Sequence, residues 1–430
     1  MHYVIIGAGP AGVIAAETLR KTDRDSQITL LGDESGMPYS RMAIPYFIAD
    51  EINAGGTHLR KEDHYAKHGL EFRNERVAYI GTQDKTLDLE SGSQLPYDRL
   101  LLATGSRPIT LPIPGVELPG VHPCWTLDQA RQIRELARPG ARVVLIGAGF
   151  IGCIVMGALL GRGATLTVLE REGQMLPRTM DETGAGMIKR WCAEKGVTVR
   201  TATRVTGIER GGYTPNSRAR LSTGLTVHTE TGEPLVADLV VLAAGVRPNL
   251  DIISGTGIHV RDGILVDEYL RTSQPDIYAA GDVAQGKDWS TGERMVHAIQ
   301  PTAVEHGRVG ALNMAGVPTV YPGSLSMNVL DTMGLVSTSL GLWDEEEWRN
   351  RGILMDRDRY RYIRLAFYED RLVGALTIGE MAGWTGTSGV LRGLIQSKTP
   401  LGKWKQRLRS DPTRVMEAYH FLTTAGGGAR

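Results

Sequence analysis

The sequence predicts an α/β protein with two Rossmann-like, three-layer dinucleotide-binding domains and a C-terminal α+β domain. Three observations lead to this fold class. A strand, a glycine-rich turn and a helix follow one another at residues 3–20, and the same pattern recurs at residues 142–162. The last hundred or so residues instead contain an antiparallel hairpin pattern followed by helical segments. A chain of 430 residues is long enough for two or three such domains.

The first glycine motif lies directly after an apolar run at residues 3–6, which is long enough for a buried strand. Gly7 is suited to the tight turn, Gly9 lets a pyrophosphate approach the backbone, and Gly12 lets the helix pack against the strand. The helix N-terminus offers N–H groups to the phosphates. A second apolar strand at 28–31 leads to Asp33, which can accept a hydrogen bond from a ribose hydroxyl.

The second glycine motif repeats this order of elements. Residues 142–146 form the strand, Gly147, Gly149 and Gly152 form the turn, and the next strand ends at Glu170. Two units imply two dinucleotides, and hydride exchange between a nicotinamide and a flavin is the chemistry that needs both. Glu170 favours the free ribose diol of NAD over the 2′-phosphate of NADP, and the neighbouring Arg171 weakens that preference without reversing it.

Two further strand exits accompany the glycine motifs. Residues 100–105 and 239–245 each end an apolar strand in a turn of small residues. Asp282 stands at the end of another apolar strand, and residues 283–284 are expected to open a helix. The carboxyl ends of strands line the ligand crevice of an open α/β sheet, so a binding role is expected for Asp282.

Composition excludes several other classes of protein. Lys and Arg together number 48, as do Asp and Glu, so no strong field attracts nucleic acid or an anionic membrane. The longest apolar stretch, residues 150–160, is too short to cross a bilayer. Cys124, Cys153 and Cys192 are far apart, which argues against a disulfide framework, a zinc site or a cluster bound by this chain. With the first strand starting almost at Met1 and no signal peptide expected, these features favour the cytoplasm.

Over residues 1 to about 320 the order of motifs resembles pyridine nucleotide–disulfide reductase-type flavoproteins, in the branch of ferredoxin and rubredoxin reductases, NADH oxidases and nitrite reductase flavin domains. The resemblance implies a discontinuous FAD domain at 1–112 and 248–320. An NAD(H) domain at 113–247 is inserted in it, and a C-terminal interface domain at 321–430 mediates dimerisation. No metal site is implied.

The resemblance also assigns site residues. Val77 is expected to contact the adenine, Asp282 the ribitol and Gln300 the flavin ring, and Arg41 and Tyr46 are the catalytic candidates. The residues implied for FAD are Gly7, Gly9, Pro10, Ala11, Gly12, Asp33, Arg41, Val77, Ala103, Thr104, Gly105, Gly281, Asp282 and Gln300. Those implied for NAD(H) are Gly147, Gly149, Phe150, Ile151, Gly152, Glu170 and Gly245.

Four positions depart from the family pattern. Met42 occupies the place of the redox cysteine of the peroxidase, oxidase and coenzyme A-disulfide members, so thiol relay at this position is excluded. Tyr46 aligns with a lysine near flavin N5, Trp125 with an arginine on FAD, and Ile154 with a glutamate that meets the nicotinamide amide. Together they indicate an unusual nicotinamide pocket, selected for a specific redox poise rather than fast turnover with NADH.

The C-terminal segment predicts one or two strands at 327–342, a hairpin at 360–378 and a helix at 390–396. The basic run at 403–409 is either a solvated helix face or a docking surface for an acidic partner. His297 and His306 lie near the expected flavin site in sequence order, as structural histidines or as proton donors.

The function inferred is that of an FAD-dependent oxidoreductase subunit, which passes electrons in either direction between NAD(H) and an iron–sulfur protein or metalloenzyme partner. The chain is expected to be a homodimer or part of a hetero-oligomer, and its third domain resembles that of FAD/NAD subunits of tungsten aldehyde oxidoreductase-like complexes. The partner surface is expected on the third domain or the loop around Arg41. A stand-alone NADH oxidase or nitrite reductase-type flavoprotein, and a flavin-bearing scaffold that responds to NAD, remain open as alternatives.

Overall fold

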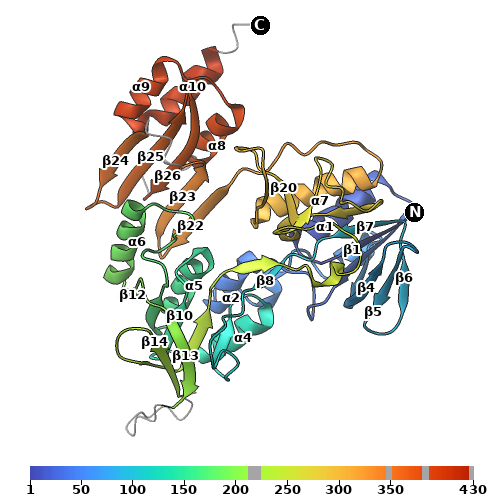
Figure 1. Cartoon of the computed structure of the whole chain (residues 1–430), viewed down its shortest axis with the longest axis horizontal. Helices are drawn as coiled ribbons and strands as arrows, with labels where there is room; N and C mark the ends of the chain where they lie inside the picture. Colours follow the sequence, from blue (N-terminus) through green and yellow to red (C-terminus); the bar gives the residue numbers. More distant parts are fainter. Residues whose placement is uncertain (212–223, 345–350, 380–386, 426–430) are drawn as a thin grey trace. The chain divides into compact units, whose positions relative to one another are not determined.

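The computed structural model describes residues 1–211, 224–344, 351–379 and 387–425 (Figure 1). The chain divides into two compact units, each built from segments distant in sequence. Unit 1 contains Met1–Phe47, Ile52–Arg107 and Val246–Ser324, and unit 2 contains Ile48–Glu51, Pro108–Gly245 and Leu325–Arg430.

Unit 1 is built around a five-stranded parallel sheet. In spatial order its strands are β19 (Ile277–Ala279), β7 (Arg99–Leu102), β1 (His2–Ile6), β2 (Gln27–Gly32) and β3 (Glu71–Asn74). Helices α1 (Pro10–Thr22) and α7 (Gln300–Met314) run side by side against this sheet (Figure 1). Their backbones are so close that a Cβ on Gly307 would lie 2.2 Å from the carbonyl oxygen of Ala11.

Smaller elements complete unit 1. Its two three-stranded sheets are β4 (Val77–Gly81), β5 (Thr86–Leu89) and β6 (Gln94–Pro96), and β18 (Ile264–Leu265), β20 (Ala284–Lys287) and β21 (Arg294–Val296). The short helical elements are η1 (Arg41–Ala43), α2 (Ile44–Ile48, which ends in unit 2), η2 (Ala54–Thr57), α3 (His64–Lys67), η3 (Asp251–Ile253) and η4 (Gly281–Val283).

The expectation of a helix opening at residues 283–284 is wrong, because strand β20 begins there. The buried side chain of Gln285 explains the strand. Its amide oxygen accepts from the N–H groups of Asp262 (3.0 Å) and Gly263 (3.2 Å), and its amide nitrogen donates to the carbonyl of Arg294 (2.9 Å). These partners come from segments that local sequence patterns do not connect.

Unit 2 contains a second five-stranded parallel sheet. In spatial order its strands are β12 (Thr198–Arg200), β11 (Thr165–Leu169), β10 (Arg142–Ile146), β16 (Leu239–Leu242) and β9 (Val121–Pro123). Its helices are α4 (Leu127–Leu136), α5 (Phe150–Gly161) and α6 (Glu182–Glu194). An antiparallel sheet of β13 (Val205–Arg210), β14 (Leu225–Thr229) and β15 (Leu235–Ala237) adjoins it along the chain.

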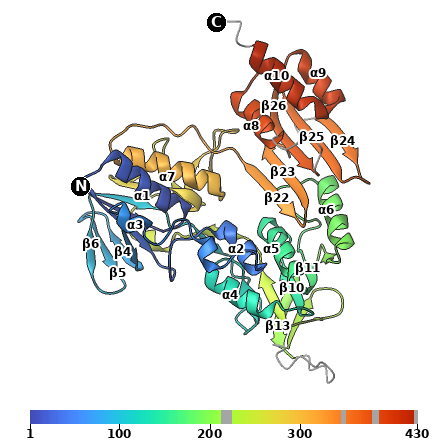
Figure 2. The same ribbon diagram turned by 180° about the vertical axis from the view of Figure 1, so that it is seen from behind.

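The C-terminal part of unit 2 is a five-stranded antiparallel sheet with helices on one face (Figures 1 and 2). In spatial order its strands are β22 (Met327–Thr332), β23 (Leu335–Gly341), β26 (Arg371–Ile378), β25 (Arg361–Tyr368) and β24 (Arg351–Asp356). The helices are α8 (Thr387–Ser397), α9 (Lys403–Ser410), η5 (Pro412–Arg414) and α10 (Val415–Ala425). The predicted hairpin is confirmed, since Tyr368 pairs with Arg371 across its turn.

Within unit 2, the C-terminal sheet joins the part that contains the parallel sheet through a largely buried polar cluster. The carboxylate of Asp181, which caps α6, accepts hydrogen bonds from the hydroxyl of Tyr362 and from the guanidinium of Arg364 at 2.7 Å. The indole N–H of Trp191 donates to the carbonyl of Thr332 at 3.0 Å. These side chains are supplied by two segments more than 140 residues apart.

The observed sheets confirm the predicted α/β fold class with two Rossmann-like parts. The chain crosses between the units within β8 (Ser106–Pro108), after Arg107, and immediately before β17 (Val246–Pro248), after Gly245, and these two strands form a two-stranded ribbon. The finer division of unit 2 into an inserted nucleotide domain and a C-terminal domain stays a prediction. None of the helices in the described part of the chain is long and apolar enough to cross a membrane.

Candidate functional site: two glycine cradles

The first glycine cradle connects β1 to α1. The Gly7 N–H donates to the carbonyl of Leu31 at 2.8 Å, and Gly7 has a φ of 112°, which an L side chain rarely adopts. A Cβ on Gly7 would lie 2.1 Å from the oxygen of Ala103, and one on Gly12 would lie 1.9 Å from the oxygen of Gly7. A Cβ on Gly9 would meet no described atom within 4 Å. Space is therefore left only at the glycine that faces out of the turn.

The second cradle connects β10 to α5 in the same way. The Gly147 N–H donates to the carbonyl of Leu169 at 2.8 Å, and Gly147 has a φ of 108°. A Cβ on Gly147 would lie 2.4 Å from the oxygen of Ala243, and one on Gly152 would lie 2.1 Å from the oxygen of Gly147. A Cβ on Gly149 again meets no described atom within 4 Å.

Helices α1 and α5 both begin at a glycine that provides no side-chain cap. The N–H groups of their first turns are therefore available to an outside acceptor, and the dipole favours an anion at this end. An open glycine in front of an uncapped helix N-terminus fits a dinucleotide pyrophosphate. In α5 the N–H groups of Phe150 and Ile151 would donate to the phosphates, whereas in α1 the first N–H available is that of Ala11, because Pro10 has none.

The acid that follows the second strand differs between the cradles. Asp33 is exposed, and no hydrogen bond or ion pair involves it within the residues that the structure describes. Its neighbour Glu34 instead accepts from both the guanidinium of Arg41 and the hydroxyl of Tyr39. Arg41 also donates to the Tyr39 hydroxyl at 3.0 Å. Glu34 therefore orients Arg41, a role that the sequence did not suggest.

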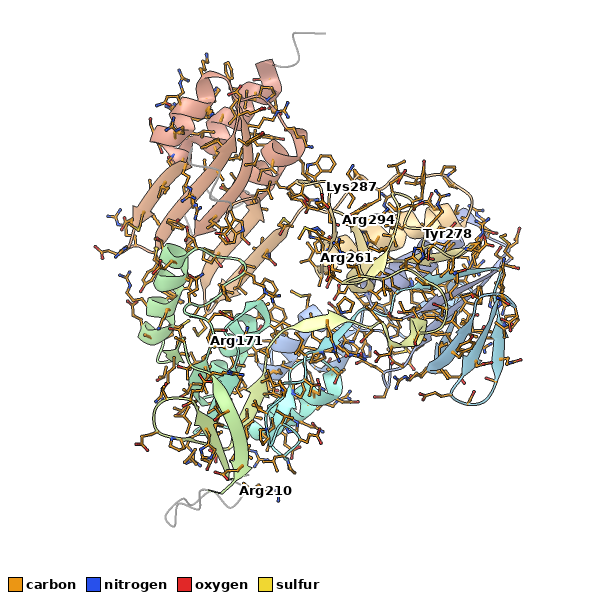
Figure 3. The ribbon with its side chains drawn as sticks, viewed as in Figure 1. Arg171, Arg210, Arg261, Tyr278, Lys287 and Arg294 are labelled. Atoms are coloured by element: carbon orange, nitrogen blue, oxygen red, sulfur yellow. The ribbon has the colours of Figure 1, made fainter. Side chains whose placement is uncertain are left out.

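Glu170, in contrast, is buried at the end of β11. One carboxylate oxygen accepts from the N–H of Ala148 at 2.7 Å, and the other accepts from the N–H of Glu172 at 2.9 Å. The carboxylate is thereby fixed beside the glycine turn. Arg171, labelled in Figure 3, is exposed and pairs with Glu172 at 2.7 Å. Its charge is thus partly neutralised by a neighbour.

Asp282 lies in η4, just after β19, and is supported by residues from two other segments. The hydroxyl of Ser106 donates to its carboxylate at 2.7 Å. Burial raises the pKa of Asp282, while the Ser106 hydrogen bond and the positive charge of Arg41 act in the opposite direction. The preceding Gly281 N–H donates to the ring nitrogen Nδ1 of buried His306 at 3.3 Å. Sequence reasoning missed Ser106, which the turn after Gly105 places here.

Hydrogen bonds also fix the other predicted residues of unit 1. The side-chain amide of Asn249 donates to the carbonyl of Thr104 at 2.8 Å, and the Asn249 N–H donates to that of Gly105 at 2.9 Å. Gln300, exposed at the start of α7, accepts from the Ser40 hydroxyl at 3.0 Å. The structure thus brings the loop at residues 39–41 and the start of α7 together.

The remaining candidates are distributed over both units. Met42 and Tyr46 are exposed on η1 and α2, which the sequence predicted only as a loop. Val77, the first residue of β4, is buried, and Ala103, which follows β7, is buried too. Gly245 adopts a φ of 102° in unit 2, where Trp125 and Ile154 are both partly buried. Binding and catalytic roles for all of these residues stay predictions.

The two histidines have different surroundings. His297 is buried with its Nε2 at 3.0 Å from the carboxylate of Asp288. His306 packs edge-on against Tyr321, and burial lowers its pKa to about 3, so its ring is neutral at physiological pH. The Nδ1 contact with Gly281 gives His306 a structural role, while a proton-donor role for His297 remains open.

Comparison with known proteins places these cradles in a family. A family model for pyridine nucleotide-disulphide oxidoreductases matches residues 1–307. Subunit epsilon of the NADH-dependent phenylglyoxylate dehydrogenase of Aromatoleum evansii is 30% identical over 417 residues, covering 96% of both chains. Rhodocoxin reductase of Rhodococcus erythropolis is 34% identical over 327 residues, covering 75% of this chain and 74% of that one. Putidaredoxin reductase, solved in a covalent complex with putidaredoxin, has a TM-score of 0.88 at 25% identity and covers 98% of this chain and 99% of its own.

Proposed function

The chain belongs to the pyridine nucleotide-disulphide oxidoreductase family, and from this premise we propose that it is the flavin subunit of a multi-subunit system that connects NAD(H) to an iron–sulfur protein or metalloenzyme. It is an FAD-dependent oxidoreductase that uses NAD(H) and exchanges electrons with ferredoxin- or rubredoxin-type proteins. Bound FAD supplies an acceptor for the two-electron hydride of NADH and a donor of single electrons. We infer in addition that the electron partner is a separate iron–sulfur protein or metalloenzyme and that it assembles with this chain.

The observation that carries the proposal is the distribution of thiols. All three cysteines are buried in unit 2, and unit 1, which contains the residues expected to bind FAD, has none. Met42 occupies the place where thiol-dependent relatives have their redox cysteine. Because all three thiols are buried and Met42 replaces the redox cysteine, we assign the second electron carrier to another protein.

A basic surface of unit 1 fits an acidic partner of this kind. Lys287 and Arg294 are paired directly across strands β20 and β21, where two like charges oppose each other. Both are exposed, and neither has a carboxylate within ion-pair distance in the described part of the chain. Arg261, labelled with them in Figure 3, donates to the carbonyl of Arg294 at 2.9 Å and is itself paired with Asp262 at 3.3 Å, so among the described residues of the patch Lys287 and Arg294 supply the unpaired charges. We name Arg261, Lys287 and Arg294 the β20–β21 basic patch.

Like charges across a strand pair reduce stability by roughly 0.2–1 kcal/mol, so a local folding role does not account for this patch. An acidic protein would neutralise it, and the attraction would weaken with salt because exposed charges are screened within about 10 Å at 0.1 M. The patch also adjoins η4 and the start of α7 along the chain, which contain Asp282 and Gln300. We therefore assign partner docking to the β20–β21 basic patch.

The two docking surfaces predicted from the sequence, the loop around Arg41 and the third domain, have weaker support than the β20–β21 basic patch. Around Arg41, the guanidinium is already paired with Glu34. On α9, Lys403, Lys405, Arg407 and Arg409 have no carboxylate partner in the described part of the chain, so this helix remains a second basic surface. It belongs to unit 2, whereas the flavin site belongs to unit 1. A comparison of charge reversals on the two surfaces tests both.

The test is NADH-driven reduction of a low-potential [2Fe–2S] ferredoxin by the purified holoprotein at several salt concentrations. We expect K287E/R294E to lower the rate at low salt about tenfold or more and to flatten its salt dependence, whereas K403E/R409E changes it less than twofold. Reduction of a viologen dye, which needs no docking, serves as the control for intact hydride transfer. Oxygen consumption as fast as ferredoxin reduction would favour the NADH oxidase alternative, and failure of NADH to bleach the flavin would favour the scaffold.

A further inference from the structure

Unit 2 includes a segment of four residues, Ile48–Glu51, that precedes the rest of the unit in the sequence. Helix α2 starts at Ile44 in unit 1, and the chain enters unit 2 at Ile48 and leaves it after Glu51. Tyr46, the catalytic candidate, lies two residues before this crossing. Whatever fixes residues 48–51 in unit 2 therefore also fixes the end of the helix that carries Tyr46.

Asp50 is the main polar anchor of this segment. Its carboxylate forms ion pairs with Arg134 of α4 and with Arg162, which follows the last residue of α5. Arg162 is only 16% exposed, and it also donates to the carbonyls of Ile48 at 3.2 Å and Ala137 at 2.8 Å. Although desolvation opposes the shift, Arg162 and Arg134 lower the pKa of Asp50. The carboxylate is therefore charged at physiological pH.

The backbone conformation of Asp50 indicates that an aspartate is present here for its carboxylate and not for the turn that its backbone makes. Asp50 has a φ of 64°, in the left-handed region that glycine adopts without strain. Aspartate is tolerated there, but a turn alone would be served better by glycine. The chain thus accepts a less favourable backbone conformation in order to place a carboxylate between two arginines.

Helix α5 connects this anchor to the second glycine cradle. Its first turn begins at the open Gly149, and its C-terminal end is capped by Arg162. A cation is favourable at that end of a helix dipole. Twelve residues at 1.5 Å each give a rod of about 18 Å. The same rigid element therefore has the NAD(H) cradle at one end and the Asp50 anchor at the other.

We propose that Asp50 is a positioning residue that fastens the end of α2, and with it Tyr46, to the helix that cradles NAD(H). Binding of the nucleotide at the first turn of α5 then steadies residues 44–52 through Arg162. Hydride transfer depends steeply on the relative placement of donor and acceptor, so loss of the anchor slows flavin reduction without weakening nucleotide binding. This inference concerns the reduction step and is independent of which partner takes the electrons.

The first measurement is hydrogen–deuterium exchange of the full-length holoprotein with and without NAD⁺. In the unaltered protein we expect NAD⁺ to slow exchange of amides 44–52 severalfold. D50N and D50G both suit a left-handed backbone but remove the charge, so they should fold and yet lose this slowing. Protection of amides in the first turns of α5 should remain. D128N, which removes the partner of Arg131 on the same helix as Arg134, is the matched control and should behave as the unaltered protein does.

The second measurement is rapid mixing with NADH under anaerobic conditions. We expect D50N and D50G to lower the limiting rate of flavin reduction about tenfold, with the Kd for NADH changed less than twofold and the FAD content unchanged. R162Q should act in the same direction. D50N/R162Q should be little worse than R162Q alone, because both changes remove the Asp50–Arg162 pair and the remaining pair of Asp50 with Arg134 is more exposed. The proposal is overturned if the limiting rate is unchanged, if the losses follow FAD content, or if NAD⁺ still protects residues 44–52 in both Asp50 variants.

Discussion

The two glycine cradles share their backbone and differ in the side chains around it. In both, the first glycine N–H donates to the second strand at 2.8 Å, its φ is near 110°, and the third glycine packs against the first. The acids that follow are not equivalent, because Asp33 is exposed whereas Glu170 is buried and fixed by two backbone N–H groups. The glycine pattern thus fixes the phosphate end of a dinucleotide site, and the residues around it set how rigid the ribose end is.

This difference suggests different uses for the two cradles. FAD stays bound through catalysis, so an exposed Asp33 can be ordered by the cofactor itself. NAD(H) binds and leaves at each turnover, and a Glu170 ordered in advance reduces the entropy lost on binding. Near the first cradle, the ion pair is formed by Glu34 with Arg41 and does not involve Asp33. The following predictions test these contrasts.

The largest effects are expected at the first glycine of each cradle. Gly7→Ala and Gly147→Ala place a Cβ 2.1 Å and 2.4 Å from carbonyl oxygens at a positive φ, so each should destabilise its own unit by about 2–5 kcal/mol. Flavin release during urea unfolding reports on unit 1. Tryptophan fluorescence reports mainly on unit 2, because only Trp289 lies in unit 1. Gly9→Ala and Gly149→Ala should leave the unfolding of the ligand-free protein unchanged, because their Cβ atoms meet no described atom within 4 Å, but they should bind FAD and NAD(H), respectively, less tightly. Equal stability losses at all four glycines in the ligand-free protein would contradict the contrast.

Removal of the acids should affect the two units unequally. Glu170→Ala leaves the N–H groups of Ala148 and Glu172 without their acceptor and should cost about 1–3 kcal/mol of unfolding free energy, whereas Asp33→Ala should cost less than about 0.5 kcal/mol. Chemical denaturation of both variants measures the difference. Glu170→Gln, which keeps one acceptor oxygen, should lie between them.

The same carboxylate should select the nucleotide. Placing Glu170 beside a 2′-phosphate costs on the order of 1–3 kcal/mol, so NADH should reduce the flavin about ten- to a hundredfold more efficiently than NADPH at low concentration. Glu170→Ala should narrow the gap mainly by weakening NADH. Arg171→Ala is the control, because Arg171 is paired with Glu172 and its loss should leave the ratio within about threefold. Equal rates with both nucleotides at low concentration would show that Arg171 overrides Glu170.

Acid should destabilise unit 1 through His306. Its pKa is lowered from 6.5 to about 3 in the folded state, mainly by burial, so the unfolded chain binds the extra proton. Above pH 6.5, His306 is neutral in both states and does not reduce the free energy of unfolding. Between pH 6.5 and 5 the unfolded chain binds a proton at His306 and the folded chain does not, so the free energy of unfolding falls by about 2 kcal/mol, and it continues to fall toward pH 3. Flavin release in urea at a series of pH values measures it. His306→Gln keeps an acceptor for the Gly281 N–H and should flatten the slope, and an unchanged slope would assign acid sensitivity to other groups.

The smallest effect is expected from the thiols. Burial raises the pKa of Cys124 and Cys192 to about 12 and raises that of Cys153 well above its usual value. Iodoacetamide at pH 8 should therefore label none of them in the folded protein and all of them after denaturation. Flavin reduction by NADH should be unchanged by the treatment, and dithionite should deliver two electrons for each FAD. An uptake of four electrons would reveal a second redox group.

Local patterns in the amino-acid sequence predict the local parts of this protein. Both strand–glycine–helix units, the acid after the second strand of each, and the hairpin of β25 and β26 follow from residues close together in the chain, because steric limits at glycine and the period of apolar residues act over a few residues. These patterns also led to the fold class and to FAD and NAD(H). They were least reliable where a short segment depends on remote partners, as at residues 283–287, which form a strand stabilised by the buried Gln285 instead of a helix.

Contacts between residues far apart in the chain follow only from the folded structure. The Ser106 hydroxyl on Asp282, the Asn249 amide on the Thr104 carbonyl and Arg162 on Asp50 join residues more than 100 positions apart, and no periodic or motif signal predicts them. Glu34 and Arg41 are seven residues apart, but their pairing depends on the fold of the loop between them and has no motif signal either. The sequence could name Asp282 and Arg41 as candidates from their place after a strand or in a loop. It could not show that Asp282 accepts a hydrogen bond from a hydroxyl or that Arg41 is paired with a carboxylate. A hydrogen bond or ion pair depends on distance in space and not on separation along the chain.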